Sequence, residues 1–433
     1  MNDRPGNVDL RQHLNKAQVA GMPLGLYLIA LVLTIGCMYA GCVPKSMIPA
    51  MLVLMVLGEG LAVLGNTLPV VKTYFGGSVV CILGGAIITY AGLLPVQTLD
   101  TLDYFINDSG FLIFYIAALI TGSLFNVDRG LLLRATVKIL PVAVCALLVG
   151  VLLSGAFGIL LGEGFWGGIL YIGVPMTSGG MTAGTLPLSE IFSQELGVEA
   201  ADVLTKMAPA TVLGNVVAIV LGGILNNVGR NHPGITGYGT LVNDGKEIKK
   251  PAPVKPTLEG LFAGMLISFG FYQLGALLHS FVDMVPTYAW MIISVVIVKC
   301  RGIMPEPMED AARVWGQFAI KAWTYACLAG IGFVLIDLNT ILSTLTPLYL
   351  IAVVLIVCAI TLTAAILGKL VGFYPLESAI AAGMCTTNMG GSGNVAVLSS
   401  AHRLELLPFA QIVTRSCGAL MLTIGGILAQ IVG

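Results

Sequence analysis

PMTSGGMTAG at residues 175–184 and CTTNMGGSGN at residues 385–394 are the two stretches that decide the fold. Each sets paired glycines among polar residues in a segment that is otherwise apolar. A simple spanning helix is a poor interpretation of such segments, because glycine and proline weaken helices. Irregular backbone at membrane depth is tolerated where it is buried in protein or lines a cavity. We therefore predict two re-entrant hairpins, at residues 167–192 and 376–400.

The composition of the whole chain is that of an integral membrane protein. Of 433 residues, 57% are hydrophobic and only 10% are charged, whereas charged residues make up about a quarter of a soluble domain. The sequence contains no basic patch interleaved with aromatic residues, which argues against a nucleic-acid partner. The nine cysteines lack the paired spacing of a disulfide framework, a zinc site or a redox motif. We expect a protein surrounded by membrane lipid, without a resident cofactor.

About eleven further apolar runs are long enough to be spanning helices, since a helix needs roughly 20 residues to cross the bilayer. They lie near residues 22–40, 48–65, 79–95, 111–127, 139–161, 207–228, 258–279, 285–300, 320–337, 346–368 and 408–432. The predicted fold class is therefore an all-α polytopic membrane protein.

The distribution of positive charge predicts which side of the membrane each loop faces. We place the N-terminus in the cytoplasm and let every span, but neither hairpin, cross the bilayer. All Lys and Arg then fall on the cytoplasmic side except Lys45, Lys206 and Arg415. Positively charged loops tend to stay in the cytoplasm. This agreement supports the number of spans and indicates a multi-pass protein of a bacterial inner membrane.

A polar segment at residues 229–257 is predicted to be a cytoplasmic linker that divides the chain. Residues 1–21 are expected to form a cytoplasmic tail, and residues 22–47 an extra N-terminal helix. The remaining segments, 48–228 and 258–433, each contain five spans with a hairpin between the fourth and the fifth. Because five is odd, the second segment enters the membrane from the opposite side. This pattern is the inverted-repeat architecture of secondary transporters.

The chemistry of the glycine stretches favours an anionic ligand. Without a Cβ nearby, backbone amides can approach a ligand closely and form an anion-binding nest. Arg415 lies within the last span, where its guanidinium needs a partner or water, and it matches a carboxylate bidentately. Alternatively, the glycines only permit close helix packing, and Arg415 pairs with Glu59 or Glu377 or extends toward the inner face.

The other polar side chains near membrane depth have structural interpretations. Glu59 pairs with a lysine or caps a kink in the second span. Glu190 and Glu377 are interpreted as helix-end caps beside the hairpins. His402 and Arg403 are expected to be interfacial anchors, with a part in anion access as the alternative.

The sequence resembles the 2-hydroxycarboxylate transporter family, which includes sodium-citrate and sodium-malate symporters. The similarity is carried by NMGGSGNVAVLS at residues 388–399, with Arg403, residues 410–412 and Arg415 after it, and by AGTLPLSEI at residues 183–191. Membership implies eleven spans, two re-entrant hairpins and an extra N-terminal helix. It also implies a homodimer and an elevator-type movement of a transport unit against a dimerisation scaffold.

Residue chemistry and the resemblance together give an expected site. Substrate is assigned to Arg415, Gly390, Gly391, Ser392, Ser178, Gly180 and Thr182. Sodium, as the coupling ion, is assigned to Asn388, Cys385, Gly179 and Met181. The tips offer neutral oxygens rather than a titratable side chain, and such oxygens suit sodium.

Two departures from the family pattern bear on the substrate, a dicarboxylate or tricarboxylate anion. Citrate-selective members have an arginine directly before the second glycine motif, where this chain has Met389. They also have Asn-Gly after the first glycine pair, where this chain has Met181 and Thr182. We therefore expect sodium symport of L-malate. The alternatives are a broad citrate and malate carrier, an exchanger of substrate for product, a channel, and a membrane-embedded enzyme, although the four histidines are dispersed and form no catalytic cluster.

Overall fold

The computed structural model describes residues 18–68, 76–126, 129–243, 255–282, 287–336, 338–339, 342, 346–388 and 390–432. The chain divides into two compact units. The first, called here the small unit, is Met1–Leu112 with Trp323–Leu338. The second, the large unit, is Ile113–Ala322 with Asn339–Gly433 and contains both glycine stretches.

The small unit starts with a two-stranded antiparallel ribbon that the sequence did not predict. Strand β1 (Gln18–Val19) pairs with β2 (Met22–Pro23), and the turn places Ala20 and Gly21 at positive φ. The ribbon falls at the end of the predicted tail, whose residues 1–17 lie outside the described part of the chain. The helical segments of this unit are α2 (Leu24–Tyr39), α3 (Met47–Thr67), α5 (Gly76–Tyr90), α6 (Val96–Asp103), η1 (Tyr104–Asp108) and η5 (Ile331–Leu335), together with the end of α15 (Glu306–Gly330).

Close packing of α3 organises the small unit. The Tyr27 hydroxyl donates to the Val56 carbonyl at 2.6 Å, which fastens α2 to α3. Gly58 lies against the backbone of Tyr325, because a Cβ there would stand only 2.5 Å from the Tyr325 carbonyl oxygen. Helix α3 continues unbroken through Glu59, which pairs with no lysine among the described residues. The lysine partner suggested for this carboxyl is therefore not found.

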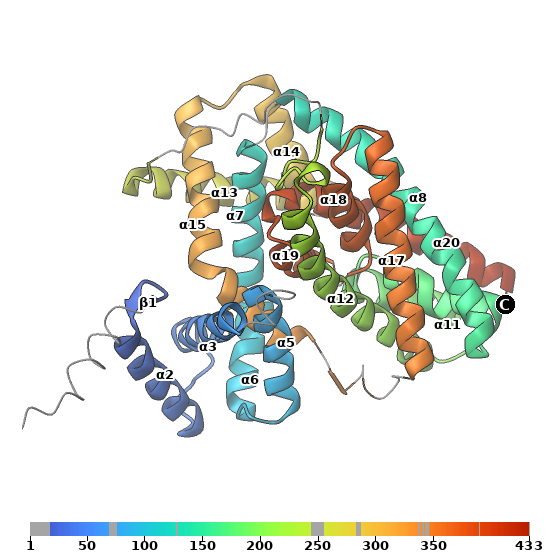
Figure 1. The fold of residues 1–433 in the computed structure, drawn as a ribbon, viewed down its shortest axis with the longest axis horizontal. Helices are drawn as coiled ribbons and strands as arrows, with labels where there is room; N and C mark the ends of the chain where they lie inside the picture. Colours follow the sequence, from blue (N-terminus) through green and yellow to red (C-terminus); the bar gives the residue numbers. More distant parts are fainter. Residues whose placement is uncertain are drawn as a thin grey trace, which may run out of the picture. The chain divides into compact units, whose positions relative to one another are not determined.

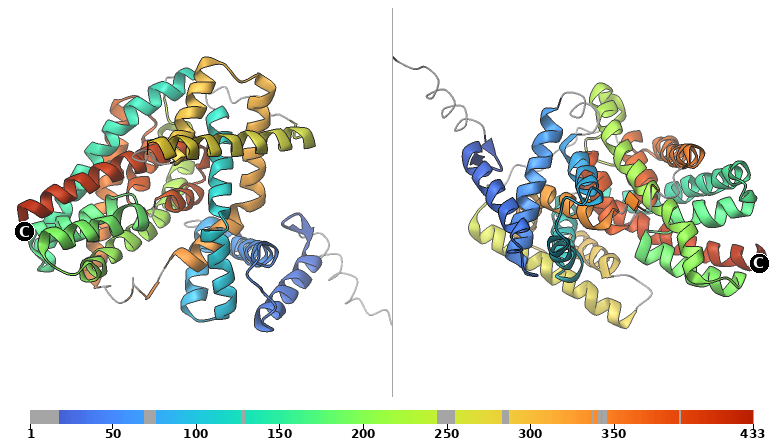
Figure 2. Two further views of the ribbon diagram at one scale, coloured as in Figure 1. Left: turned by 180° about the vertical axis from the view of Figure 1, so that it is seen from behind. Right: turned by 90° about the horizontal axis from the view of Figure 1, so that it is seen from below.

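The large unit is built mainly from long helices and short broken ones (Figure 1). In order, they are α7 (Phe111–Asn126), α8 (Arg129–Leu161), α9 (Gly164–Gly168), η2 (Ile169–Gly173), α10 (Val174–Thr177), η3 (Met181–Thr185), α11 (Leu186–Leu196), α12 (Ala200–Asn231), η4 (Pro233–Ile235), α13 (Leu258–Phe281), α14 (Thr287–Arg301), α15, α17 (Pro347–Leu370), α18 (Pro375–Ser378), η6 (Ala379–Gly383), η7 (Met384–Thr386), α19 (Gly391–Ser400), η8 (Leu404–Leu406) and α20 (Leu407–Val432). Helix α17 lies beside α8, α19 beside α12, and α20 beside α11 (Figures 1 and 2).

Local sequence explains where several of these helices begin. Thr257 caps α13 by accepting the Gly260 amide at 3.0 Å, and Thr346 caps α17 by accepting the Tyr349 amide at 3.2 Å. Such caps satisfy amides that have no partner within the helix. Pro347 at the start of α17 removes a donor that would go unused there.

Helical segments cover most of each apolar run that was predicted to span the membrane. Within the described part of the chain, seven helices are long and apolar enough to cross a bilayer: Met47–Thr67, Val137–Leu161, Asp202–Asn231, Leu258–Phe281, Glu306–Leu335, Pro347–Leu370 and Leu404–Val432. A further pair, Val96–Asp108 and Phe111–Phe125, passes the same test together but is bent by 42°. A multi-pass helical membrane protein is therefore confirmed.

Each predicted hairpin contains two helical arms around a break. In the first, α9, η2 and α10 lead to the break at residues 178–180, after which η3 and α11 follow. In the second, α18, η6 and η7 precede the break, and α19 begins at Gly391. Gly179 (φ 90°), Gly180 (φ 108°) and Gly390 (φ 82°) adopt backbone conformations that side chains disfavour. The glycine pairs thus mark the two breaks, as their sequence predicted.

Candidate functional site

The tip of the first hairpin is formed by Ser178, Gly179 and Gly180. The Ser178 hydroxyl donates to the Pro175 carbonyl at 2.8 Å, so its oxygen keeps only acceptor capacity. The Gly180 carbonyl accepts the amides of Gly184 (2.9 Å) and the residue after it (3.0 Å), which starts the returning arm. Met181 opens η3, and Thr182 lies in the same segment, although its side chain is outside the described set.

The tip of the second hairpin is held by an amide network. Asn388 donates through Nδ2 to Asn394 Oδ1 at 2.7 Å, and its Oδ1 accepts the Gly390 amide at 2.9 Å. The backbone amide of Asn394 donates to the Gly390 carbonyl at 2.8 Å. Both asparagines are fully buried. The Ser392 side chain and the whole of Met389 lie outside the described residues.

The tips of the two hairpins meet. A Cβ on Gly390 would stand 2.7 Å from the Gly179 carbonyl oxygen, so only a glycine permits this approach. Helix α20 closes the same place, because a Cβ on Gly418 would stand 2.7 Å from the Ser178 carbonyl oxygen. Close packing is therefore a feature of these glycines, and the anion-binding interpretation stays a prediction.

Helix α20 presents a polar face to the second tip. Thr414 donates to the Cys385 carbonyl at 2.6 Å and lies 3.1 Å from Asn394 Oδ1. Gln411 Nε2 donates to the Gly391 carbonyl at 3.4 Å. Neither Thr414 nor Gln411 was predicted to be a site residue. Gln411 precedes Thr414 by three residues and Arg415 by four within an apolar segment, and this helical spacing was the signal that could have found them.

Arg415 also lies at the tip of the second hairpin. Its Nη2 would be 3.9 Å from a Cβ on Gly391. Its Nε has no hydrogen-bond acceptor, and no carboxylate among the described residues pairs with it. Glu377, one of the suggested partners, is bound by Arg403 instead. The guanidinium is therefore available to an anionic ligand.

Comparison with known proteins places the whole chain in one group. The 2-hydroxycarboxylate transporter family matches residues 19–427. The chain belongs to that family. It is 37% identical over 417 residues to the citrate transporter CitP of Lactococcus lactis subsp. lactis, covering 96% of this chain and 94% of that protein. It is 36% identical to the malate transporter MleP of Lactococcus lactis subsp. lactis strain IL1403, over 96% of this chain and 99% of that protein. It is 31% identical to the Na(+)-malate symporter of Bacillus subtilis strain 168, over 95% of this chain and 92% of that protein.

Membership in the 2-hydroxycarboxylate transporter family confirms the resemblance and excludes the interpretation as an enzyme. The matched family and relatives are transporters. The interpretation as a membrane-embedded enzyme is therefore wrong, and the prediction that the chain is not an enzyme is confirmed.

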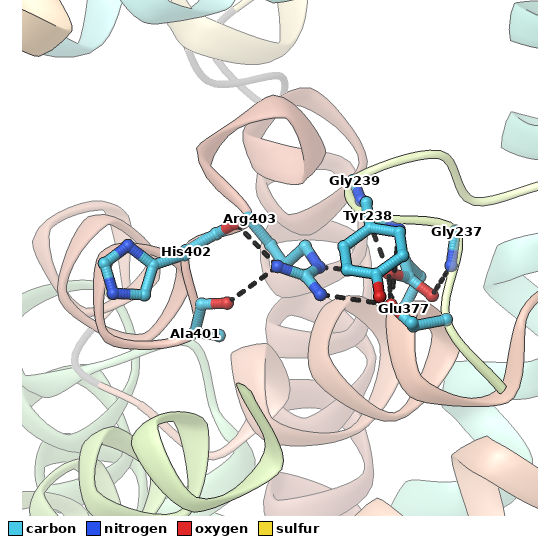
Figure 3. A network of polar contacts seen from close by, with 8 residues as sticks. Gly237, Tyr238, Gly239, Glu377, Ala401, His402 and Arg403 are labelled. Atoms are coloured by element: carbon cyan, nitrogen blue, oxygen red, sulfur yellow. Dashed lines mark hydrogen bonds and ion pairs between the residues drawn. The ribbon is translucent and has the colours of Figure 1, made fainter. Parts of the chain in front are cut away.

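A second polar cluster in this family member lies at the base of the second hairpin (Figure 3). Arg403 Nε lies 3.0 Å from Glu377 Oε1, and both side chains are buried, at 4% and 0% exposure. The Glu377 carboxylate also accepts the Thr236 hydroxyl (2.8 Å) and the Gly237 amide (2.8 Å). Arg403 Nη1 donates to the carbonyls of Ala401 and the residue after it. We call these contacts the hairpin-base cluster.

The hairpin-base cluster corrects two predictions. Arg403 is not an interfacial anchor, because its guanidinium is buried and paired with Glu377. His402 beside it is exposed. Glu377 does lie in the first turn of α18, but its carboxylate joins the two arms and the start of the linker rather than only capping a helix end. The linker segment after α12 is therefore packed against the hairpin base, with residues 244–254 outside the described part.

Proposed function

We propose that this chain is a secondary active transporter that carries a small 2-hydroxycarboxylate across the bacterial inner membrane together with sodium. The observation that carries the proposal is Arg415, whose guanidinium lies beside the meeting point of two glycine tips and pairs with no carboxylate in the described part of the chain. A guanidinium at membrane depth is costly and marks a functional site. Its fork fits a carboxylate bidentately. Relatives named as citrate and malate transporters support this class of substrate.

L-Malate is the proposed substrate. Arg415 would hold one carboxylate, and the second would rest on the amides of Gly180, Gly390 and Gly391 and on hydroxyls of Ser178, Thr182 and Ser392. Citrate-type relatives are expected to have an arginine at the position of the apolar Met389. The third carboxylate of citrate would therefore lack a cationic partner here. Leaving an anion without countercharge at membrane depth is unfavourable.

Sodium is the proposed coupling ion. The candidate ligands are neutral oxygens at the two tips, contributed by Asn388 and by the backbones of Cys385, Gly179 and Met181. Oxygen ligands of this kind, freed where a helix is interrupted, coordinate sodium in transporters. The relative named as a Na(+)-malate symporter supports this assignment.

The proposed architecture has eleven spans and two re-entrant hairpins in inverted repeats, residues 48–228 and 258–433, after the extra helix at 22–47. The N-terminus is cytoplasmic, and transport proceeds by an elevator-type movement within a homodimer. The matching helical breaks at residues 178–180 and at Gly390 support the repeat. Membrane-impermeant labelling of single cysteines placed at Lys45 and Lys255 tests the orientation, since the two loops are proposed to face opposite sides.

Substitution of Arg415 tests the proposal most simply. Arg415→Ala should abolish binding and uptake of L-malate without loss of folded protein, because the carboxylate loses its countercharge. Arg415→Lys should keep weakened activity, since an ammonium cannot reproduce the bidentate fork. Arg313→Ala is the matched control, because that guanidinium pairs with Asp310 instead. Malate uptake by Arg415→Ala proteoliposomes at the wild-type rate would contradict the proposal.

A broad citrate and malate carrier, or an exchanger of substrate for product, is the second candidate. It is favoured by the nearly equal identity to a citrate transporter and a malate transporter, 37% and 36%. Proteoliposomes loaded with unlabelled malate or citrate and given labelled malate distinguish these functions. Exchange that continues without sodium on either side would identify the exchanger.

A further inference from the structure

A buried side-chain oxygen of Gln411 has no hydrogen-bond partner among the residues that the structure describes. The Gln411 side chain lies on α20 and is 1% exposed. Its Nε2 donates to the Gly391 carbonyl, and Oε1 has no hydrogen-bond donor among the described residues. The Gly391 carbonyl can only accept, so the amide nitrogen must face it and the oxygen must face elsewhere. An unsatisfied buried acceptor is uncommon and calls for an explanation.

This oxygen belongs to the same surface as the proposed carboxylate site. Gln411 precedes Arg415 by one helical turn, so the two side chains lie on one face of α20. A Cβ on Gly391 would stand 3.6 Å from Gln411 Nε2 and 3.9 Å from Arg415 Nη2. Both side chains therefore flank the backbone of the second hairpin tip, and a ligand held by one is within reach of the other.

The chemistry of the oxygen selects its ligand. An amide oxygen accepts hydrogen bonds and cannot bind a carboxylate, which at neutral pH is also only an acceptor. A dianionic 2-hydroxycarboxylate has a single donor, the hydroxyl on the carbon next to one carboxylate. That arrangement matches a guanidinium and an acceptor set side by side.

We propose that Gln411 Oε1 accepts the 2-hydroxyl of the substrate whose neighbouring carboxylate is bound by Arg415. Gln411 is then a specificity-determining residue, and this assignment rests on the proposed function. A substrate analogue without the hydroxyl leaves the buried oxygen unpaired. Sites built around such a hydrogen bond discriminate strongly against the analogue that lacks it.

The test compares L-malate with succinate, which differs only in lacking the hydroxyl. Calorimetric binding to the purified protein in sodium should be tighter for L-malate than for succinate. Gln411→Met removes the acceptor at similar volume, so it should weaken malate binding by about fivefold or more and leave succinate binding unchanged. Gln430→Met, on the exposed end of the same helix, is the matched control and should change neither.

A structural role for Gln411 gives a different result. Equal weakening of malate and succinate in Gln411→Met would overturn the assignment while leaving the proposed function intact. The wild-type protein supplies a test that needs no variant, since 2-methoxysuccinate keeps the oxygen but cannot donate. It should bind no better than succinate, and binding as tight as that of malate would overturn the assignment. Failure of the wild-type protein to bind malate, succinate and citrate alike would remove the proposed function and this inference together.

Discussion

Met389 is the residue at which the proposed preference for a dicarboxylate can be altered. Met389→Arg would add a second guanidinium beside the Gly390 tip, where citrate-type relatives are expected to have one. The added charge-assisted hydrogen bond should shift preference toward citrate by about 1–3 kcal/mol if its geometry is good. The quantity to measure is the ratio of citrate to malate inhibition of labelled malate uptake.

A control substitution at Met389 separates the effect of charge from the effect of side-chain size. Met389→Leu keeps an apolar side chain of similar volume and should leave the ratio unchanged. A wild-type protein that already prefers citrate, or a Met389→Arg variant with an unmoved ratio, would mean that one arginine does not limit the substrate to two carboxylates.

Asn388 is the residue whose substitution should change the affinity for sodium most. Its Oδ1 already accepts the Gly390 amide, so the side chain holds the tip and offers an oxygen to a cation at once. Asn388→Ala should raise the sodium concentration for half-maximal malate uptake. Asn107→Ala, which removes an exposed amide bonded to Asp103, is the matched control. An unchanged sodium dependence in Asn388→Ala would exclude this residue from the cation site.

The second hairpin, as an element, depends on the hairpin-base cluster. Glu377 begins one arm, Arg403 follows the other, and Thr236 belongs to the linker, so one ion pair connects three separate segments. Removing one partner of a buried pair leaves an uncompensated charge, which costs about 3–5 kcal/mol. Glu377→Ala should therefore lower the thermal unfolding temperature of the purified protein. The same substitution at the exposed Glu190 should have little effect, and equal unfolding temperatures for both variants would contradict the importance of the cluster.

The elements of this fold differ in how far the sequence revealed them. Both hairpin breaks could be predicted because Gly179, Gly180 and Gly390 stand in polar contexts inside apolar segments, and positive φ there requires glycine. Helix ends were less predictable. Helix α8 begins at Arg129 and α12 at Ala200, well before their apolar runs, because polar residues extend a helix beyond its lipid-facing part.

The remaining contacts could not be predicted because they are tertiary. No local pattern pairs Glu377 with Arg403, since their ion pair depends on how the arms of the second hairpin return toward each other. The approach of Thr414 and Gln411 to the tip likewise depends on which face of α20 turns toward the hairpins. Arg415 was predictable because a guanidinium within an apolar span is conspicuous in any orientation.

At the scale of the whole molecule, the central claim is that a sodium gradient drives accumulation of a 2-hydroxycarboxylate. Uptake of labelled L-malate into proteoliposomes, with sodium and proton gradients imposed separately, tests it most directly. We predict accumulation above the external concentration under an inward sodium gradient, loss of that accumulation when the gradient is collapsed, and no uptake by Arg415→Ala. Accumulation driven by a proton gradient without sodium, or malate entry that never exceeds equilibrium, would contradict the account.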